Sequence, residues 1–210
     1  MSRTSADQSL ARLDRAFYRR DAARVARELL GQRLVHIRDG VRVAGTIVET
    51  EAYLGTNDKA AHSYNGRRTA RTETMYADGG TVYVFLNYGI HHLFNVVVAH
   101  QEEPQAVLIR ALEPTEGLAA IRARRPRARQ ARDLCSGPGK LGAALAIDLS
   151  HDGADLVTSA SLFIERARQR PLPKRQIIVG PRIGVDYAGE WAAEPLRFHI
   201  AGNIHVSGRS

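Results

Sequence analysis

Cysteine is nearly absent from this sequence of 210 residues, which contains only one, Cys135. A single thiol excludes an internal disulfide and any metal centre built from several thiolates, and it fits a reducing compartment. We expect Cys135 to be a small core residue rather than a catalytic one. Long apolar runs are also absent, and the opening residues MSRTSADQSLARL are too polar for a secretion signal. We therefore expect a soluble, cytoplasmic protein with no membrane partner.

Acidic residues are in the minority among the charged side chains. Asp and Glu number 22 against 30 Lys and Arg, which gives a formal net charge of +8. The excess is mainly arginine, whose planar guanidinium suits phosphates and base edges, so nucleic acid is the first candidate partner. A chain of this length with 44% hydrophobic residues can bury one sizeable core. We predict one domain over residues 13–210, preceded by a flexible polar arm over residues 1–12.

Apolar periodicity predicts a sheet with helices around it. Residues 19–32 read as a helix that Asp21 caps and Gly31 ends. Two further helices are predicted over 116–125 and from Pro138 onward. Strand-like runs are predicted at 34–37, 41–54, 81–86, 94–100, 106–112, 161–166, 176–185 and 196–202.

The stretch IVETEAYLG, residues 47–55, carries two glutamates in a strand-like run. A strand period of two assigns its residues to two faces, Val48, Thr50, Ala52 and Leu54 on one and Ile47, Glu49, Glu51 and Tyr53 on the other. The two carboxylates would stand about 7 Å apart, which resembles the spacing in inverting glycosidases. Two other interpretations remain open at this point. Both glutamates could pair with arginines, or they could form a metal site with DKAAH downstream.

Aromatic residues concentrate near a predicted hairpin. Tyr83 and Phe85 share one strand face, and Asn87, Tyr88 and Gly89 look like the tip between two apolar runs. This is either an ordinary hairpin or one whose exposed Tyr88 acts as a wedge between bases.

Three other segments carry polar groups that could meet an anion. The loop that contains His62 is rich in Asn, Gly and Arg, as phosphate-facing loops are, although a lone histidine is more often structural. The helix start at SGPGKL could bind an anion, but its spacing is not that of a nucleotide-binding P-loop. The stretch RARRPRARQAR is either solvated or a phosphate contact.

Seven stretches together resemble one family, the alkyladenine (3-methyladenine) DNA glycosylases of the mammalian alkyladenine type, which are monofunctional enzymes of base-excision repair. In chain order they are GTIVETEAYLG, AAHSYNGRRT, GTVYVFLNYG, LIRALEPTEG, DLCSGPGKL, RIGVDYAGEW and PLRFHIAG. They run through nearly the whole chain, and an ordered set is far more specific than any single motif.

The resemblance implies three catalytic positions. Glu51 matches the general base that activates the water attacking the deoxyribose C1′. Arg110 matches an arginine that helps to hold that water, and Ile183 matches a residue whose backbone carbonyl also orients it.

The resemblance also implies five positions that contact the substrate. Tyr53, His62 and Phe85 match the residues that sandwich the flipped base, and Asn95 matches a side chain that clashes with the guanine amino group. Tyr88 matches the tyrosine that intercalates into the hole left in the duplex. Phe85 departs from the family pattern, because the best-known members have tyrosine there. Stacking needs only the ring, so the substrate range is the property that this departure affects.

The implied chemistry is self-consistent without a cofactor or metal. The enzyme would flip an alkylated or deaminated purine, such as 3-methyladenine, out of duplex DNA. N-alkylated purines carry positive charge and leave readily, so Glu51 suffices as base and the two-carboxylate interpretation fails. Glu49 is left as an ion-pair partner of an arginine, outside the chemistry. No lysine matches a catalytic position, so hydrolysis should leave an abasic site without strand cleavage.

The resemblance completes the predictions for fold and partner. It implies a mixed α/β domain on a curved, mainly antiparallel sheet, with surrounding helices and a protruding hairpin that intercalates into DNA. The partner would be double-stranded DNA with damaged bases, bound through its minor groove by a monomer. In a bacterium, the protein would be associated with the nucleoid. Two alternative functions stay open: a non-catalytic binder of distorted nucleic acid, and a metal-dependent nuclease that uses Glu49, Glu51, Asp58 and His62.

Overall fold

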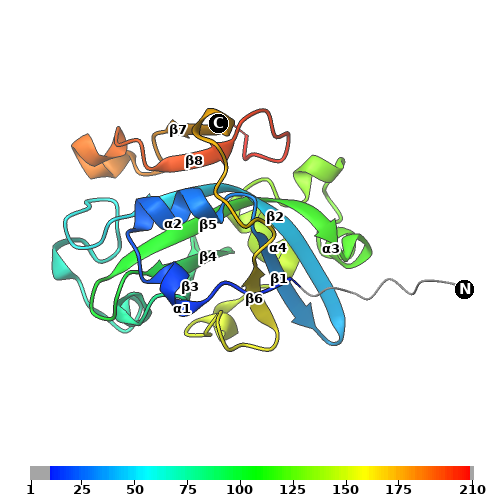
Figure 1. Cartoon of the computed structure of the whole chain (residues 1–210), viewed down its shortest axis with the longest axis horizontal. Coiled ribbons are helices and arrows are strands. Elements are labelled where there is room, and N and C mark those ends of the chain that lie inside the picture. Colours follow the sequence, from blue (N-terminus) through cyan, green and yellow to red (C-terminus); the bar gives the residue numbers. More distant parts are fainter. Residues whose placement is uncertain (1–9, 209–210) are drawn as a thin grey trace, which may run out of the picture.

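Eight strands form one antiparallel sheet in the computed structural model, which describes residues 10–208 (Figure 1). The strands are β1 (Arg33–Arg38), β2 (Val41–Tyr53), β3 (Val82–Asn87), β4 (His91–Val98), β5 (Gln105–Glu116), β6 (Leu162–Glu165), β7 (Ile177–Gly180) and β8 (Arg197–Ile200). Each strand-like run of the sequence is one of these strands, and every pairing between them is antiparallel. The predicted mixed α/β fold with an antiparallel sheet is confirmed.

The long strand β2 is the branch point of the sheet. The main path runs β3-β4-β5-β2-β1-β6, and β8 pairs with β2 and β7. The first half of β2 pairs with β1, whereas Glu49, Thr50 and Glu51 in its second half pair with β8. β7, β8 and the C-terminal segment therefore lie together along one side of the molecule (Figure 1). This branch brings the C-terminal segment to the glutamates of β2.

Residues 10–208 contain four α-helices, α1 (Arg15–Tyr18), α2 (Ala22–Leu29), α3 (Leu118–Arg124) and α4 (Pro138–Leu145). The sequence predicted α2, α3 and α4, but not the short helix α1. The Asp21 side chain caps α2 by accepting hydrogen bonds from the backbone of Ala23 and Arg24. The apolar stripe of α2 is fully buried, and the helix packs on β2 and β5. α4 packs on β4 and β5, with Pro138 in its first turn.

The sheet has two chemically different faces. On β3, β4 and β5, alternate residues enter the main core, namely Val82, Val84, Phe94, Val96, Val98, Val107 and Ile109. The residues between them face the other side, where a cavity lies, and they include Tyr83, Phe85, Leu93, Asn95, Leu108 and Arg110. The strand period therefore separates a purely apolar face from a functional one.

A bulge in β2 corrects one sequence prediction. The strand period placed Ile47 on the same face as Glu49, but Ile47 is buried in the main core together with Ala52. The register against β5 shifts between Ile47 and Glu49 and again between Glu49 and Thr50. Because the extra residue of a bulge re-aims the side chains that follow it, Glu49 and Glu51 turn toward the cavity side.

The N-terminal prediction falls largely outside the described residues. The expected arm covers residues 1–12, of which 1–9 are not described. Within its last residues, Ala11 accepts a hydrogen bond from the backbone of Arg166, and Arg12 forms a bridge with Glu165 at the end of β6. Between residues 10 and 208, no helix has both the length and the apolar character needed to cross a bilayer.

Candidate active site

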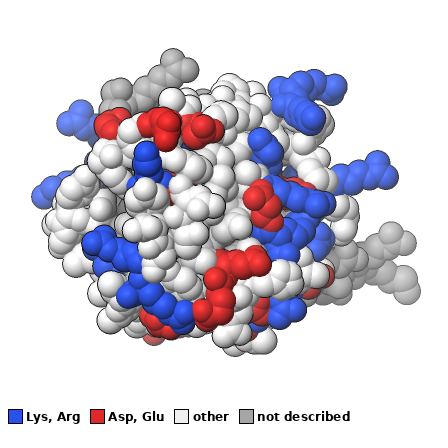
Figure 2. Space-filling model, turned by 90° about the vertical axis from the view of Figure 1, so that its left-hand side faces the viewer, with Lys and Arg blue, Asp and Glu red and all other residues white. Residues whose placement is uncertain are grey.

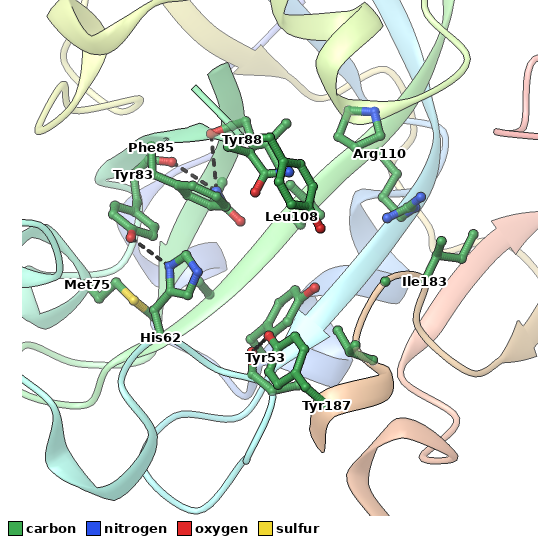
Figure 3. A pocket seen from close by; sticks show the side chains of 18 residues that line it. Tyr53, His62, Met75, Tyr83, Phe85, Tyr88, Leu108, Arg110, Ile183 and Tyr187 are labelled. Carbon is green, nitrogen blue, oxygen red and sulfur yellow. Dashed lines mark hydrogen bonds between the residues drawn. The ribbon is translucent and has the colours of Figure 1, made fainter. Parts of the chain in front are cut away.

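A cavity of about 400 Å³ opens on the functional face of the sheet. This volume lies within the range of small-molecule sites. Its wall includes Tyr53, His62, Met75, Tyr83, Phe85, Tyr88, Asn95, Leu108, Arg110, Ile183 and Tyr187. Figure 3 shows His62, Tyr83 and Phe85 on one side of the open centre and Arg110 and Ile183 on the other. The cavity is therefore aromatic on one side and carries a cation on the other.

The register of the sheet assembles this wall. Tyr83 of β3 pairs with Asn95 of β4, Asn95 pairs with Leu108 of β5, and Leu108 pairs with Glu51 of β2. Glu51 in turn pairs with Arg197 of β8. Five strands thus place these five residues in one row across the sheet. Since neighbouring strands lie about 4.8 Å apart, the row spans roughly 19 Å across the sheet.

Glu51 lies fully buried behind the cavity wall and contacts three residues that line it. Its Oε1 accepts a hydrogen bond from the Ile183 backbone N–H at 2.8 Å and pairs with Arg110 Nη1 at 3.1 Å. Its Oε2 accepts from the Tyr53 hydroxyl at 2.9 Å. The contact with Ile183 is made by the N–H, whereas the resemblance implied a role for the carbonyl. Burial, and after it the Glu51 carboxylate, raises the pKa of Tyr53 well above its usual value, so Tyr53 remains a donor.

Arg110 joins Glu51 to the second glutamate of the strand. Arg110 Nε lies 3.1 Å from Glu49 Oε1, and Arg197 Nε donates to the same oxygen at 2.6 Å. Ser207 donates to Glu49 twice, from its N–H at 2.7 Å and from its hydroxyl at 2.8 Å. Burial favours a raised pKa for Glu49, but Arg110, then the Ser207 N–H and Arg197, outweigh it and lower that pKa. Glu49 is therefore an ionised, fully buried acceptor of four hydrogen bonds.

A second buried ion pair supports the segment that contains Ile183. Arg182 donates to both carboxylate oxygens of Asp58, at 2.5 and 2.9 Å, and both side chains are completely buried. Arg182 also donates to the backbone carbonyls of Ala52 and Trp191, and its guanidinium lies 4.8 Å from the centre of the Tyr53 ring. It thereby ties the loop after β2 to the residue whose N–H contacts Glu51.

Aromatic rings form the opposite wall. The His62 and Phe85 rings meet edge to face, with their centres 4.5 Å apart, and His62 Nδ1 lies 2.9 Å from the Tyr83 hydroxyl. Burial, with smaller contributions from Arg71 and Arg67, lowers the pKa of His62 to about 4. His62 is therefore neutral at pH 7, and the Arg71 guanidinium lies 5.3 Å from the centre of the Phe85 ring. The amide of buried Asn95 donates to the carbonyls of Tyr83 and Leu93, which fixes its orientation beside the rings.

The hairpin tip and a second tyrosine flank the mouth of the cavity. Tyr88 and Gly89 both have positive φ, and the Ile90 N–H donates to the Asn87 carbonyl, as in a two-residue type I′ turn. The predicted hairpin tip is thus confirmed, and Tyr88 is 87% exposed. Tyr187, in the turn Asp186–Ala192, also lines the cavity and is anchored by a hydrogen bond from its hydroxyl to the Ala60 carbonyl.

Sequence reasoning assigned no role to Arg182, Tyr187, Arg197 or Ser207, and it missed the ion pair of Asp58. Arg182 and Tyr187 lie in the stretch RIGVDYAGEW, which drew attention only for Ile183, and Asp58 was considered only as a metal ligand. Asp58 is instead paired with Arg182, and His62 with Tyr83. Within residues 10–208, no three His, Cys, Asp or Glu side chains gather closely enough to hold a metal ion. The ligand set of the nuclease alternative is therefore not assembled in the described part of the chain.

The remaining charged and reactive features lie outside the cavity wall. Cys135 is fully buried, and burial raises the pKa of its thiol to about 12, which fits the predicted core role. In the arginine-rich stretch, Arg122, Arg127, Arg129 and Arg132 are exposed. On the face drawn in Figure 2, basic and acidic side chains alternate around a broad uncharged area. This face therefore carries charges of both signs around the uncharged area.

Comparisons with known proteins find relatives along most of this chain. A family model described as methylpurine-DNA glycosylase matches residues 16–204. A provisionally named 3-methyladenine DNA glycosylase of Bacillus cereus (strain ATCC 10987 / NRS 248) is 48% identical over 199 residues, which cover 91% of this chain and 97% of the relative. Another with the same name, from Natranaerobius thermophilus, is 45% identical over 197 residues, covering 93% of this chain and 98% of the relative.

These matches assign the chain to a class of enzymes and to one family within it. The class is that of the DNA N-glycosylases, hydrolases that repair alkylated bases in DNA. Within this class, the chain belongs to the methylpurine-DNA glycosylase family. The predicted family of 3-methyladenine DNA glycosylases is thus confirmed, but its mammalian type is not, because both relatives named above are bacterial.

Proposed function

We propose that this protein flips N-alkylated purines out of duplex DNA and hydrolyses their N-glycosidic bond, leaving an abasic site. The observation that carries the proposal is the position of Glu51, a carboxylate held by three donors directly behind an aromatic cavity. A carboxylate accepts about four hydrogen bonds, so one acceptor position remains for a water molecule. Glu51 would take a proton from that water as it attacks C1′, and its charge would stabilise the cationic sugar of the transition state.

The aromatic wall supports recognition of a cationic base. A ring stacked on a nucleobase contributes ~1–3 kcal/mol, and the π face attracts a positively charged purine. Tyr53, His62 and Phe85 would enclose the base, with His62 neutral at pH 7. The Asn95 side chain would clash with the amino group of guanine and so exclude that base. Arg110 and Ile183 would orient the water together with Glu51.

The exposed hairpin supports a role in extrusion of the nucleotide. Tyr88 would enter the minor groove and fill the hole that the flipped nucleotide leaves, which offsets part of the cost of flipping. We further propose that residues 13–210 act as one glycosylase domain, as a monomer in the cytoplasm, associated with the nucleoid in a bacterium. The residue roles of the mammalian alkyladenine type are carried over to this chain as part of the same proposal.

Replacement of Glu51 by glutamine tests the assignment. We expect Glu51→Gln to abolish release of 3-methyladenine from methylated duplex DNA while it leaves lesion binding nearly intact, because the amide keeps the shape but cannot accept the proton. Base release is measured under single-turnover conditions in the presence of chelator, and binding is measured by fluorescence anisotropy. Normal turnover by the variant would overturn the role of Glu51. Strand cutting that the chelator suppresses would instead support a nuclease.

A further inference from the structure

Glu49 lies two residues before Glu51, and the structure connects it to the same site. It accepts hydrogen bonds from Arg110, Arg197 and Ser207, and Arg110 also pairs with Glu51. Both carboxylates are fully buried, and the Arg110 side chain is only 7% exposed. Screening by water is therefore weak between these groups, and each charge acts strongly on the others.

We propose that Glu49 is a positioning residue for this reaction: it orients Arg110 and offsets the arginines around Glu51, so that the site carries no surplus positive charge that would repel a cationic purine. This inference rests on the proposed function. It gives Glu49 a part in the reaction, whereas the sequence alone had placed Glu49 outside it.

The orientation follows from the two ends of one guanidinium group. Arg110 Nε lies 3.1 Å from Glu49, and Arg110 Nη1 lies 3.1 Å from Glu51. A planar guanidinium with both ends engaged has little freedom to rotate. Without the Glu49 carboxylate, Arg110 could turn its full fork toward Glu51 and occupy the acceptor position that the attacking water needs.

The charge balance follows from the groups that face the two carboxylates. These are Tyr53 of β2, Arg110 of β5, Arg197 and His199 of β8, and Arg182 with Tyr187 after β7. Arg182 is neutralised by Asp58. The two glutamates then balance Arg110 and Arg197, so that the cluster is close to neutral. Loss of the Glu49 charge would leave two arginines around one carboxylate.

A surplus positive charge at this place would act on both substrate and base. It would disfavour an N-alkylated purine, which is itself a cation, and the cationic sugar of the transition state. It would also make Glu51 a weaker base by stabilising its ionised form. A neutral lesion such as hypoxanthine would escape only the repulsion of the purine itself, because its hydrolysis also passes through a cationic sugar. The proposal therefore predicts a change in lesion preference as well as in rate.

The test compares two variants with opposite changes of charge, Glu49→Gln and Arg197→Met, in the full-length protein. Single-turnover release of 3-methyladenine and of hypoxanthine from duplex DNA is measured between about pH 3.5 and pH 8, a range that includes the usual glutamate pKa of about 4.3. We expect the acidic limb of the rate profile to move down by about one pH unit in Glu49→Gln. This shift is the size that two charges about 7 Å apart produce at an effective dielectric constant between about 20 and 80. In Arg197→Met the acidic limb should move to higher pH, because a positive charge near Glu51 is lost.

Lesion preference gives the second readout. At pH 7.5, Glu49→Gln should lose about tenfold more activity on 3-methyladenine than on hypoxanthine, a ratio equivalent to one pH unit. Glu113→Gln is the matched control, because Glu113 also bonds the C-terminal segment, through Asn203, but makes no ion pair in the described structure. It should keep the wild-type profile and preference.

The outcomes separate this inference from the proposed function. Limbs that stay in place, or that move in the same direction in both variants, would overturn the inference while the wild type remains an active glycosylase. If Glu49→Gln does not fold, as judged by its thermal unfolding, Arg197→Met decides alone, and an unmoved limb in that variant overturns the inference. A wild-type protein that releases neither base would overturn the proposed function, and this inference with it.

Discussion

Replacing Arg182 by methionine removes the cationic half of an ion pair whose two side chains are both fully buried. Methionine has a similar length and is apolar, so the change creates little empty space. It leaves the Asp58 carboxylate with only the backbone N–H groups of Leu54 and Ala60 as donors. The carbonyls of Ala52 and Trp191 also lose the donor that Arg182 supplies.

The expected cost is large because a buried charge is left without its partner. Breaking such a pair costs ~3–5 kcal/mol of unfolding free energy. For a chain of this size each kcal/mol corresponds to a fall of roughly 2–4 °C in Tm, so we expect a decrease of roughly 6–20 °C. Urea denaturation at pH 7.5 gives the free energy, and calorimetry gives Tm. Base release should fall as well, because Ile183 then loses the neighbour that holds its N–H against Glu51.

Two further variants make this prediction refutable. Arg24→Met is the control, since Arg24 is 64% exposed and pairs with Glu28 on the surface of α2, where a salt bridge contributes below about 1 kcal/mol. The double variant Arg182→Met with Asp58→Leu should recover part of the stability, because both buried charges are then gone. A decrease in unfolding free energy below about 1 kcal/mol in Arg182→Met would refute the reasoning. So would a double variant whose decrease is larger than the sum of the decreases in the two single variants.

Two other predictions concern the cavity and its mouth. Tyr88→Asn should raise Kd for a lesion duplex about tenfold, because the lost ring stacking is worth ~1–3 kcal/mol. Asparagine tolerates the positive φ of this turn position, so the turn itself should be kept. An unchanged Kd, measured by fluorescence anisotropy, would contradict the role of Tyr88 as a wedge. The pKa of His62 is lowered from 6.5 to about 4 in the folded protein, so its share of stability is present above about pH 6.5 and is lost as the pH falls toward 4. When the pH falls from 7.5 to about 5, the unfolding free energy of His62→Gln should therefore decrease by about 2 kcal/mol less than that of the wild type, as measured by urea denaturation. Equal decreases would count against the lowered pKa of His62.

Local sequence signals were sufficient for the elements of the fold. The period of two predicted each strand, and Asp21 and Gly31 bracketed the helix α2 that the structure contains. The hairpin at Tyr88 followed from a turn sequence between two apolar runs. These signals work because they depend on interactions between residues close in the chain, namely capping bonds, turn geometry and alternation of faces.

The sequence also identified the candidate residues of the site. It singled out Glu51, Tyr53, His62, Phe85 and Tyr88 through their resemblance to a family, and four of these line one cavity, with Glu51 directly behind its wall. Their catalytic and binding roles stay predictions, which the variants above address.

Tertiary structure alone decided how the two glutamates differ. The bulge after Ile47, the branch of β2 and the arrival of β8 with Ser207 surround Glu49 with four donors, whereas Glu51 contacts Arg110, Ile183 and Tyr53. Arg197, Ser207 and Arg182 come from segments more than 120 residues away in the chain. No periodicity or local motif encodes such contacts, because long-range strand pairing and burial set them. The different environments of Glu49 and Glu51 therefore exist only in the folded chain.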